Sequence, residues 1–166
     1  MVERGTEFTN LEVAGVTLLP MICYEDIMPG FVREMWRRAG PTGLLLNVSN
    51  DSWFGDSAMP YIHLNAARLR AIENRVSVVV ASNTGPSVIF DPWGRSVALI
   101  DRLFSTGTAA ALISKGRDGT TYSQYGDFFA YACMIISIFW LCWMMMFRRI
   151  TPRISSRGGL RATLRK

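Results

Sequence analysis

The sequence predicts an α/β domain followed by a single membrane-spanning helix. Three observations lead to this prediction. Short apolar runs alternate with segments of helical periodicity through roughly the first two thirds of the chain. An uncharged run then extends from 128 to 147, and residues 148–166 are rich in arginine and contain no acidic residue. A hydrophobic content of 49% is high for a purely soluble domain, which agrees with a membrane segment.

Six apolar runs predict strands. Each is four to eight residues long, rich in Val, Ile or Leu, and bounded by Gly, Pro or Asn. The predicted strands are Val16–Cys23, Gly43–Val48, Val76–Ser82, Ser87–Phe90, Ser96–Ile100 and Thr108–Ile113. The Asp-Pro-Trp-Gly segment at 91–94 predicts a turn between two of them, because its glycine readily takes the positive φ that such a turn needs.

Two segments between the strands have helical spacing, Pro29–Ala39 and Pro60–Arg75. In the second, the proline fits the first turn of a helix. Four apolar residues of this segment fall on one face: Ile62, Ala66, Leu69 and Ile72. The order of strands and helices predicts a layered α/β domain whose sheet is covered by helices.

The run from Phe128 to Phe147 predicts a transmembrane helix. Its 20 residues carry no charge, and at 1.5 Å per residue they span about 30 Å, the thickness of a bilayer core. The alternative is a buried helix of a soluble domain, but such helices rarely stay uncharged for so long. We therefore expect a catalytic α/β domain at 1–115, a polar linker at 116–127, the membrane helix at 128–147 and a basic tail at 148–166.

The charge of the chain is concentrated in that tail. It holds seven of the 18 Lys and Arg residues, which leaves 11 basic against 13 acidic residues in the rest of the chain. The positive-inside rule and attraction to anionic lipid explain a basic tail beside an apolar span. This predicts a cytoplasmic tail, with residues 1–127 on the other side of the membrane, and it makes nucleic-acid binding an unfavoured interpretation.

Cys23 is the most informative single residue. It stands at the end of an apolar strand and directly before Glu25 and Asp26, where a strand running into a sharp loop would hold a thiol rigidly as a nucleophile. The alternative is a buried, inert cysteine, which is common. Cys133 and Cys142 lie inside the predicted span, so no disulfide framework is implied.

Metal-dependent and serine-based sites are not expected. The chain has no Gly-x-Ser-x-Gly, His-Glu-x-x-His or Cys-x-x-Cys motif, and His63 is its only histidine. We expect neither a metal nor another cofactor. His63 pairs with Cys23 in one interpretation; in the favoured one it caps the first turn of its helix or faces solvent.

Four motifs carry a family resemblance. They are Ile22-Cys-Tyr-Glu25, the segment Asn-Val-Ser-Asn-Asp-Ser-Trp-Phe-Gly at 47–55, His63 with Ala-Arg-Leu-Arg-Ala-Ile-Glu at 67–73, and Ser-Asn-Thr-Gly at 82–85. In order and spacing the chain resembles the C-terminal half of apolipoprotein N-acyltransferases, membrane members of the nitrilase (carbon–nitrogen hydrolase) superfamily. The resemblance covers about residues 11–147 and implies part of an α/β/β/α sandwich followed by one span.

The resemblance also implies a reaction and its participants. Members of this family transfer a fatty acyl chain from a phospholipid, through a cysteine thioester, to the amine of a diacylglyceryl apolipoprotein at the bacterial inner membrane. Cys23 matches the nucleophile, the backbone N–H of Tyr24 would lie in the oxyanion hole, and Glu25 would fix the loop or help to deprotonate the amine. Trp53 would line the opening for the acyl chain, although loop aromatics are more often core residues.

Three residues of the second predicted helix, Arg68, Arg70 and Glu73, are expected to form a supporting ion-pair network rather than to react. The chain also departs from the family pattern, in which a catalytic Glu and Lys precede the cysteine by long intervals. Only 22 residues precede Cys23; they include no lysine, and their glutamates Glu3, Glu7 and Glu12 lie too near. Lys115 follows the last predicted strand and does not match.

We therefore expect the chain to be the C-terminal piece of a longer or split N-acyltransferase with several spans, because residues 1–10 contain no apolar run typical of a signal peptide. The missing N-terminal half would be its partner, and the isolated piece would be inactive. Two alternatives remain open: an amide or nitrile hydrolase of the nitrilase type, which the span disfavours, and a non-catalytic membrane-anchored remnant, which the missing Glu and Lys favour.

Overall fold

The computed structural model describes residues 5, 7–39, 43–114 and 119–150, with only the backbone described at 148–150. The chain divides into two compact units, 1–126 and 127–166. In the described residues the first unit holds every strand, and the second consists of one long helix.

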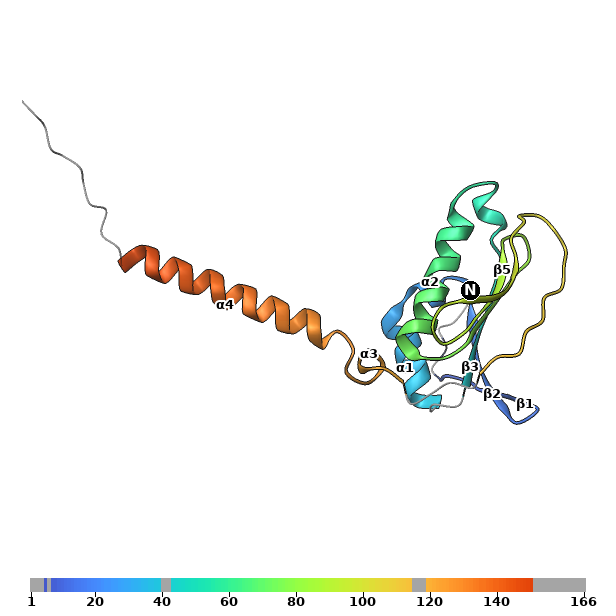
Figure 1. Ribbon diagram of the computed structural model, residues 1–166, viewed down its shortest axis with the longest axis horizontal. Helices are drawn as coiled ribbons and strands as arrows, with labels where there is room; N and C mark the ends of the chain where they lie inside the picture. Colours follow the sequence, from blue (N-terminus) through green and yellow to red (C-terminus); the bar gives the residue numbers. More distant parts are fainter. Residues whose placement is uncertain (1–4, 6, 40–42, 115–118, 151–166) are drawn as a thin grey trace, which may run out of the picture. The chain divides into compact units, whose positions relative to one another are not determined.

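The first unit is built on a six-stranded sheet whose strands lie side by side in chain order (Figure 1). The strands are β1 (Leu11–Val13), β2 (Val16–Ile22), β3 (Gly43–Ser49), β4 (Val78–Ser82), β5 (Ser87–Phe90) and β6 (Ser96–Ile100). β2, β3 and β4 pair in parallel, whereas the other neighbours pair antiparallel. Parallel neighbours need a crossover connection, and helices supply both crossovers here.

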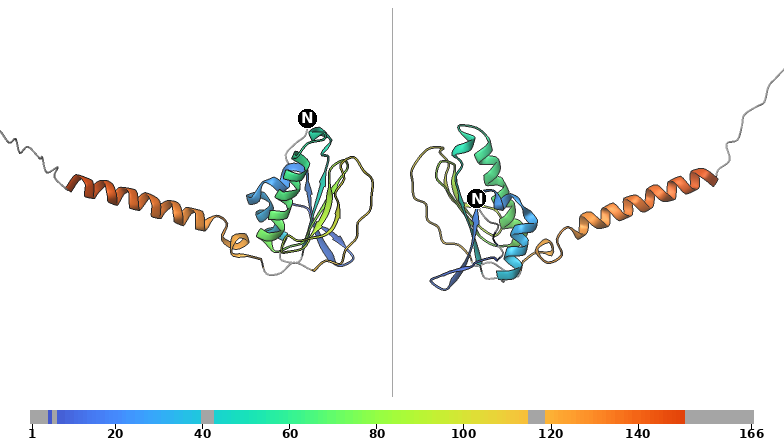
Figure 2. Two further views of the ribbon diagram at one scale, coloured as in Figure 1. Left: turned by 45° about the horizontal axis from the view of Figure 1, so that its top comes forward. Right: turned by 180° about the vertical axis from the view of Figure 1, so that it is seen from behind.

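The crossover helices are α1 (Pro29–Ala39) and α2 (Met59–Asn74), and they cover the same face of the sheet (Figure 2). Two short 3-10 helices, η1 (Cys23–Ile27) and η2 (Ser52–Phe54), lie in the loops that follow β2 and β3. α3 (Thr121–Tyr125) and α4 (Phe128–Ile150) come after the sheet.

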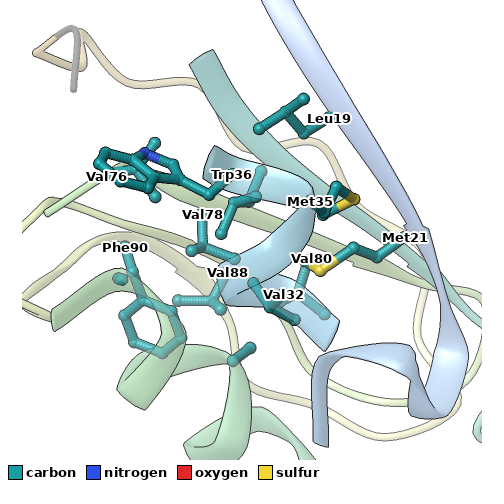
Figure 3. Close-up of a cluster of buried hydrophobic side chains, with 13 residues drawn as sticks. Leu19, Met21, Val32, Met35, Trp36, Val76, Val78, Val80, Val88 and Phe90 are labelled. Carbon is teal, nitrogen blue, oxygen red and sulfur yellow. The ribbon is translucent and has the colours of Figure 1, made fainter. Parts of the chain in front are cut away.

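The hydrophobic core fills the space between the sheet and these two helices (Figure 3). Successive strand residues point to opposite faces, so Leu19 and Met21 are fully buried while Ile22 is 70% exposed. Burying one such side chain stabilises the fold by about 1.5–3 kcal/mol. The buried apolar side chains are Leu19, Met21, Val32, Met35, Trp36, Leu45, Ala67, Ala71, Val76, Val78, Val80, Val88 and Phe90.

The opposite face of the sheet is apolar but only partly covered. Leu18, Leu46 and Val79 are half-buried there, and Val48 is 53% exposed. The chain at 101–114 runs along this side without joining the sheet, and no helix of the described residues covers it (Figures 1 and 2). The two crossover helices, α1 and α2, therefore pack on one face of the sheet only.

The predicted α/β class and the apolar C-terminal helix are confirmed. Five of the six predicted strands form within two residues of their expected ends, and the first predicted helix has the expected bounds. The turn at 91–94 is also present, with Gly94 at φ +75°. Its Asp91 Oδ1 accepts hydrogen bonds from the backbone N–H groups of Trp93 and Arg95 at 2.9 Å each.

One strand prediction was wrong, and one strand was not predicted. Thr108–Ile113 forms no strand, because a short apolar run does not by itself determine pairing with a sheet, and its Leu112 is fully exposed. β1 was not predicted, because it is only three residues long. It pairs with β2 through Ala14 and Gly15, both at positive φ, which is the backbone form of a tight hairpin turn.

The buried face of α2 also differs from the apolar stripe seen in the sequence. Ile62 and Leu69 are 56% and 50% exposed. The buried residues of this helix are Pro60, His63, Ala67, Arg70, Ala71 and Asn74. His63 is buried against two aspartates of other segments, whereas Arg70 and Asn74 make their hydrogen bonds within α2, and a count of apolar residues reveals neither.

α4 forms the second unit. Its segment Phe128–Phe147 has a mean hydropathy of 2.0, and it is the one helix in the described residues that is long and apolar enough to cross a membrane. The side chains of 148–150 and all of 151–166 lie outside the described residues, as does Lys115. The predicted basic tail and its side of the membrane therefore stay predictions.

The segment interpreted as a linker contains α3, which is held against α1. Arg33 Nε donates to the carbonyls of Tyr122 and Ser123 at 3.0 Å each, and its Nη2 donates to Gln124 O at 2.7 Å. Thr120 Oγ1 donates to the backbone carbonyl of Glu73 at the end of α2. One guanidinium thus binds three carbonyls of the short helix, and that of Tyr122 also accepts a hydrogen bond from the N–H of Gly126 at 2.6 Å.

Replacing Arg33 by methionine should release α3. Hydrogen bonds to a charged donor are worth about 1.5–3 kcal/mol each, and this change removes all of them. We expect chymotrypsin to cleave the variant after Tyr122 or Tyr125 at least about tenfold faster than the wild type. Arg37→Met is the matched control, since Arg37 lies on the same helix and pairs only with Glu34 at the surface. Equal cleavage of the two variants would contradict the role of Arg33.

Candidate active site

The chain turns sharply where β2 ends. Cys23 has φ +52°, in the left-handed region, and it begins η1 directly after the strand. A non-glycine residue pays about 1–2 kcal/mol for this conformation, so the surrounding contacts must hold it. The cysteine is partly exposed rather than fully buried, which differs from the inert, buried thiol of the alternative interpretation.

Three side chains fix this turn through its backbone. Glu25 Oε2 accepts a hydrogen bond from the N–H of Ile22 at 2.7 Å, across the base of the loop. The carbonyl of Cys23 accepts from Asn47 Nδ2 at 3.1 Å and faces His63 Nε2 at 3.2 Å. Side chains from both β3 and α2 thus hold the loop that carries the thiol through the carbonyl of Cys23.

His63 lies in a buried cluster with two carboxylates. Its Nε2 is 2.9 Å from Asp26 Oδ1, and its Nδ1 is 3.1 Å from Asp51 Oδ1. All three side chains are at most 3% exposed. The hydrogen bond to Asp26, with the charge of both aspartates, raises the pKa of His63 from 6.5 to about 9 against the opposing effect of burial. The expectation that His63 faces solvent was wrong, and its ring meets the backbone of Cys23.

Asp51 links this cluster to the ends of β3 and β4. It accepts hydrogen bonds from the hydroxyls of Ser49 and Ser82, each at 2.7 Å. Ser82 Oγ in turn accepts from the N–H of Gly85 at 2.9 Å. A side chain at Gly85 would collide with the Asp51 carboxylate and lie 2.9 Å from Ser82 Oγ. The Ser-Asn-Thr-Gly motif therefore serves as packing around Asp51.

Aromatic rings close the outer side of the cluster. Tyr24 stacks on the His63 ring, with centroids 5.2 Å apart and planes 16° apart, and it contacts Phe54 at 5.9 Å. Trp53 is 82% exposed, so it is not a core residue of the described structure. It projects from η2, in the loop that follows β3.

The supporting residues divide into two groups. Arg70 Nη2 donates to Glu73 Oε1 at 3.0 Å along α2, as an ion pair. Arg68 instead donates from Nε to the carbonyl of Gly94 at 2.7 Å, and so holds the β5–β6 turn against the helix. The expected single network is thus two separate contacts.

Sequence analysis missed Asp26, Asn47 and Asp51 as parts of the site. Asn47 and Asp51 lie within the motif at 47–55, and Asp26 directly follows the motif that ends at Glu25. Asn47 Nδ2 also donates to Asp26 Oδ2 at 2.5 Å, so the three residues and His63 form one connected network. The available signal was their position, because Asp26, Asn47 and Asp51 lie at or just beyond the carboxyl ends of neighbouring parallel strands, where side chains converge.

The described residues offer no group of three ligands arranged for a metal ion. Both ring nitrogens of His63 face carboxylates, so neither is free to coordinate a metal. A hollow of about 800 Å³ lies beside α1 and includes Glu25 of the site in its lining. Its lining residues are Gly5, Glu7, Phe8, Glu25, Met28, Phe31, Glu34 and Arg38.

Comparison with known proteins places this geometry in a family context. The family model for carbon–nitrogen hydrolases matches residues 1–120. The chain is similar to the apolipoprotein N-acyltransferase of Agrobacterium fabrum, with 42% identity over 117 residues, which cover 70% of this chain and 21% of that protein. It is also similar to that of Geobacter metallireducens, with 36% identity over 130 residues, 78% of this chain and 24% of the relative.

The match to these relatives is therefore partial, since the chain spans less than a quarter of their length. Among solved structures, a mutant amidase from Nesterenkonia sp. AN1, in which acrylamide has added to the active site cysteine, superimposes with a TM-score of 0.53. Its sequence identity is 20%, and the match covers 80% of this chain and 51% of the amidase. This likeness supports the nitrilase-like α/β fold.

The stability of the protein should depend on the protonation of His63. Because its folded pKa of about 9 lies above the ordinary 6.5, the imidazolium stabilises the fold fully below pH 6.5, and this contribution is lost as the pH rises through 9. The contribution reaches about 3 kcal/mol. We expect the difference in apparent Tm between the wild type and His63→Gln to shrink from pH 6 to pH 10. A difference that stays constant would contradict a folded pKa of about 9 for His63.

Gly85→Ala should destabilise the site by about 1–3 kcal/mol, because the added methyl group displaces Asp51 or Ser82. Gly30→Ala is the matched control: Gly30 lies in α1, and nothing lies within 4 Å of its added carbon. We expect a lower apparent Tm for Gly85→Ala and an unchanged or slightly higher one for Gly30→Ala. An unchanged Tm for both would contradict the tight packing around Asp51.

Proposed function

Because the chain belongs to the carbon–nitrogen hydrolase family, we propose that its Cys23 is the nucleophile of an acyl transfer in lipoprotein maturation. The donor is a phospholipid, and the acceptor is the N-terminal amine of a diacylglyceryl apolipoprotein. The observation that carries the proposal is the strained, partly exposed Cys23 at the end of β2, held by three side chains through its backbone. Strain of this kind clusters at functional sites.

The reaction proceeds in two balanced steps. The Cys23 thiolate attacks the ester carbonyl of the phospholipid, a C–S bond forms, the C–O bond breaks, and the lysophospholipid leaves as an alcohol with the proton taken from the thiol. The amine of the acceptor then attacks the thioester, an amide C–N bond forms, and the thiol is restored. In both steps the N–H of Tyr24 stabilises the negative charge on the carbonyl oxygen.

The other side chains of the site assist this chemistry. Glu25 holds the loop through Ile22, as its hydrogen bond of 2.7 Å supports. Trp53, which is exposed beside the loop, offers an apolar surface for the acyl chain. Arg68, Arg70 and Glu73 support the walls of the site through their contacts along α2 and with the β5–β6 turn.

A base and an oxyanion-binding cation must come from elsewhere in the protein. In the described residues before Cys23 there is no lysine. Glu7 and Glu12 lie too near Cys23 in the sequence to match the catalytic glutamate of the family pattern. The relatives are more than four times as long as the segment that matches. We therefore place the catalytic carboxylate and ammonium on a part of the enzyme outside these 166 residues.

α4 provides the membrane attachment. Its apolar length supports insertion into the bacterial inner membrane, with the catalytic unit on the extracytoplasmic side and the basic tail in the cytoplasm. Amide hydrolysis is the second candidate, since the family model is that of carbon–nitrogen hydrolases. The span and the similarity to N-acyltransferases favour transfer to a lipoprotein amine over transfer to water.

The nucleophile can be tested in a chimera, in which this chain replaces the segment that it matches in the Agrobacterium fabrum relative. Given a phospholipid with radiolabelled acyl chains and no acceptor, the chimera should accumulate a label that hydroxylamine removes, as expected for a thioester. Cys23→Ala should abolish this label. Cys133→Ala and Cys142→Ala are the controls, since both cysteines lie in α4 and should leave it intact.

Label that persists in Cys23→Ala would refute the nucleophile assignment. Label that forms but passes to water as fast as to an apolipoprotein acceptor would favour the hydrolase. A chimera with no thioester on any cysteine would favour a non-catalytic chain.

The orientation has a separate test. A peptide tag placed after Lys166 should resist external protease in spheroplasts and be cleaved only after the membrane is permeabilised, because the positive-inside rule keeps the arginine-rich tail in the cytoplasm. Cleavage in intact spheroplasts would reverse the proposed topology.

A further inference from the structure

The carbonyl group of Cys23 is held in an unusual way. Its oxygen accepts a hydrogen bond from Asn47 Nδ2 at 3.1 Å and lies 3.2 Å from His63 Nε2, although Cys23 follows the last residue of β2 and is not part of the sheet. Asn47 comes from β3 and His63 from α2, so two separate elements converge on one backbone oxygen. Both side chains are buried, at 0% and 3% exposure.

That oxygen belongs to the same peptide group as the N–H of Tyr24. A peptide group is planar and trans, so its C=O and N–H bonds point in opposite directions. Donors that fix the Cys23 oxygen on the buried side therefore fix the Tyr24 N–H away from them. This N–H is the donor that the proposed function assigns to the oxyanion.

The contacts of His63 require that it carries both ring protons. Nε2 faces Asp26 Oδ1 and the Cys23 carbonyl, and Nδ1 faces Asp51 Oδ1. A neutral ring would turn one lone pair toward a carboxylate. Tyr24 stacks on the face of the ring, with the ring centroids 5.2 Å apart. The hydroxyls of Ser49 and Ser82 engage Asp51 and keep it in place.

We propose that His63 is a positioning residue for the acyl transfer, which as an imidazolium holds and polarises the Cys23–Tyr24 peptide so that the Tyr24 N–H binds the oxyanion more strongly. A charged donor on a carbonyl draws electron density from its peptide nitrogen, and hydrogen bonds in such a chain strengthen one another. This inference rests on the proposed function, because it concerns the same reaction. It adds a buried cation that never touches the substrate.

The test separates attack by sulfur from stabilisation of the oxyanion. Alkylation of Cys23 by iodoacetamide needs the thiolate but forms no oxyanion, whereas acylation by phospholipid needs both. In the chimera, His63→Gln should lower the acylation rate about 10- to 100-fold, less than or similar to the loss of a whole oxyanion donor. The alkylation rate and the KM for phospholipid should each change by less than about threefold.

Two further variants complete the experiment. Asn74→Ala removes another buried polar side chain of α2, one whose amide bonds only within the helix, and it should leave acylation unchanged. Asp51→Asn keeps the shape of the cluster while removing one negative charge that favours the imidazolium. Asp51→Asn should lower the acylation rate by less than His63→Gln does and leave the alkylation rate normal. It provides the test if His63→Gln does not fold.

The pH dependence gives a readout that a purely structural role would not change. The ratio of the wild-type acylation rate to that of His63→Gln should fall toward one as the pH rises through about 9, where the ring loses its second proton. Dividing each acylation rate by the alkylation rate of the same protein at the same pH corrects for ionisation of the thiol.

Each outcome bears on a different claim. An equal fall in alkylation and acylation would overturn the inference, because His63 would then place the thiol rather than the oxyanion donor. Acylation at the wild-type rate in both His63→Gln and Asp51→Asn would overturn it as well. Thioester label that survives Cys23→Ala would instead remove the proposed function itself.

Discussion

The buried histidine between two aspartates is the interaction on which the rest of the site depends. A charge inside a protein is costly unless it is paired and hydrogen-bonded, and His63, Asp26 and Asp51 satisfy one another across three separate segments of the chain. Because removal of one member leaves the others buried without compensation, the loop after β2, the loop after β3 and the start of α2 are bound into one unit. This makes the region around Cys23 rigid without a metal or a disulfide in the described residues.

Rigidity matters because the backbone at Cys23 is strained. The left-handed φ is tolerated since Glu25, Asn47 and His63 each grip a backbone group of the turn. A thiol held in this way needs little reorganisation when it attacks a carbonyl, which is how an active site converts folding energy into orientation. The same contacts orient the next peptide N–H, so the proposed nucleophile and the proposed oxyanion donor are set by one local structure.

The architecture explains where this site lies. β2, β3 and β4 run in parallel, and their carboxyl ends present Cys23, the Asp51 loop and the Ser82–Gly85 turn at one edge of the sheet. The helices that connect the strands lie on one face and contribute His63 from the first turns of α2. The other face keeps apolar side chains such as Val48 partly exposed, in keeping with a chain that spans less than a quarter of its relatives.

The sequence alone determined the features that depend on local patterns. Apolar runs and their boundaries predicted β2, β3, β4, β5 and β6, the spacing of α1 predicted its limits, and the uncharged run predicted the apolar helix. The end of a strand before two acids pointed to Cys23. Tertiary structure decided which face of α2 is buried, whether 108–113 joins the sheet, and that His63 lies inside rather than in solvent. These outcomes depend on partners far apart in the chain, since Asp26 precedes His63 by 37 residues, and no local period records such a meeting.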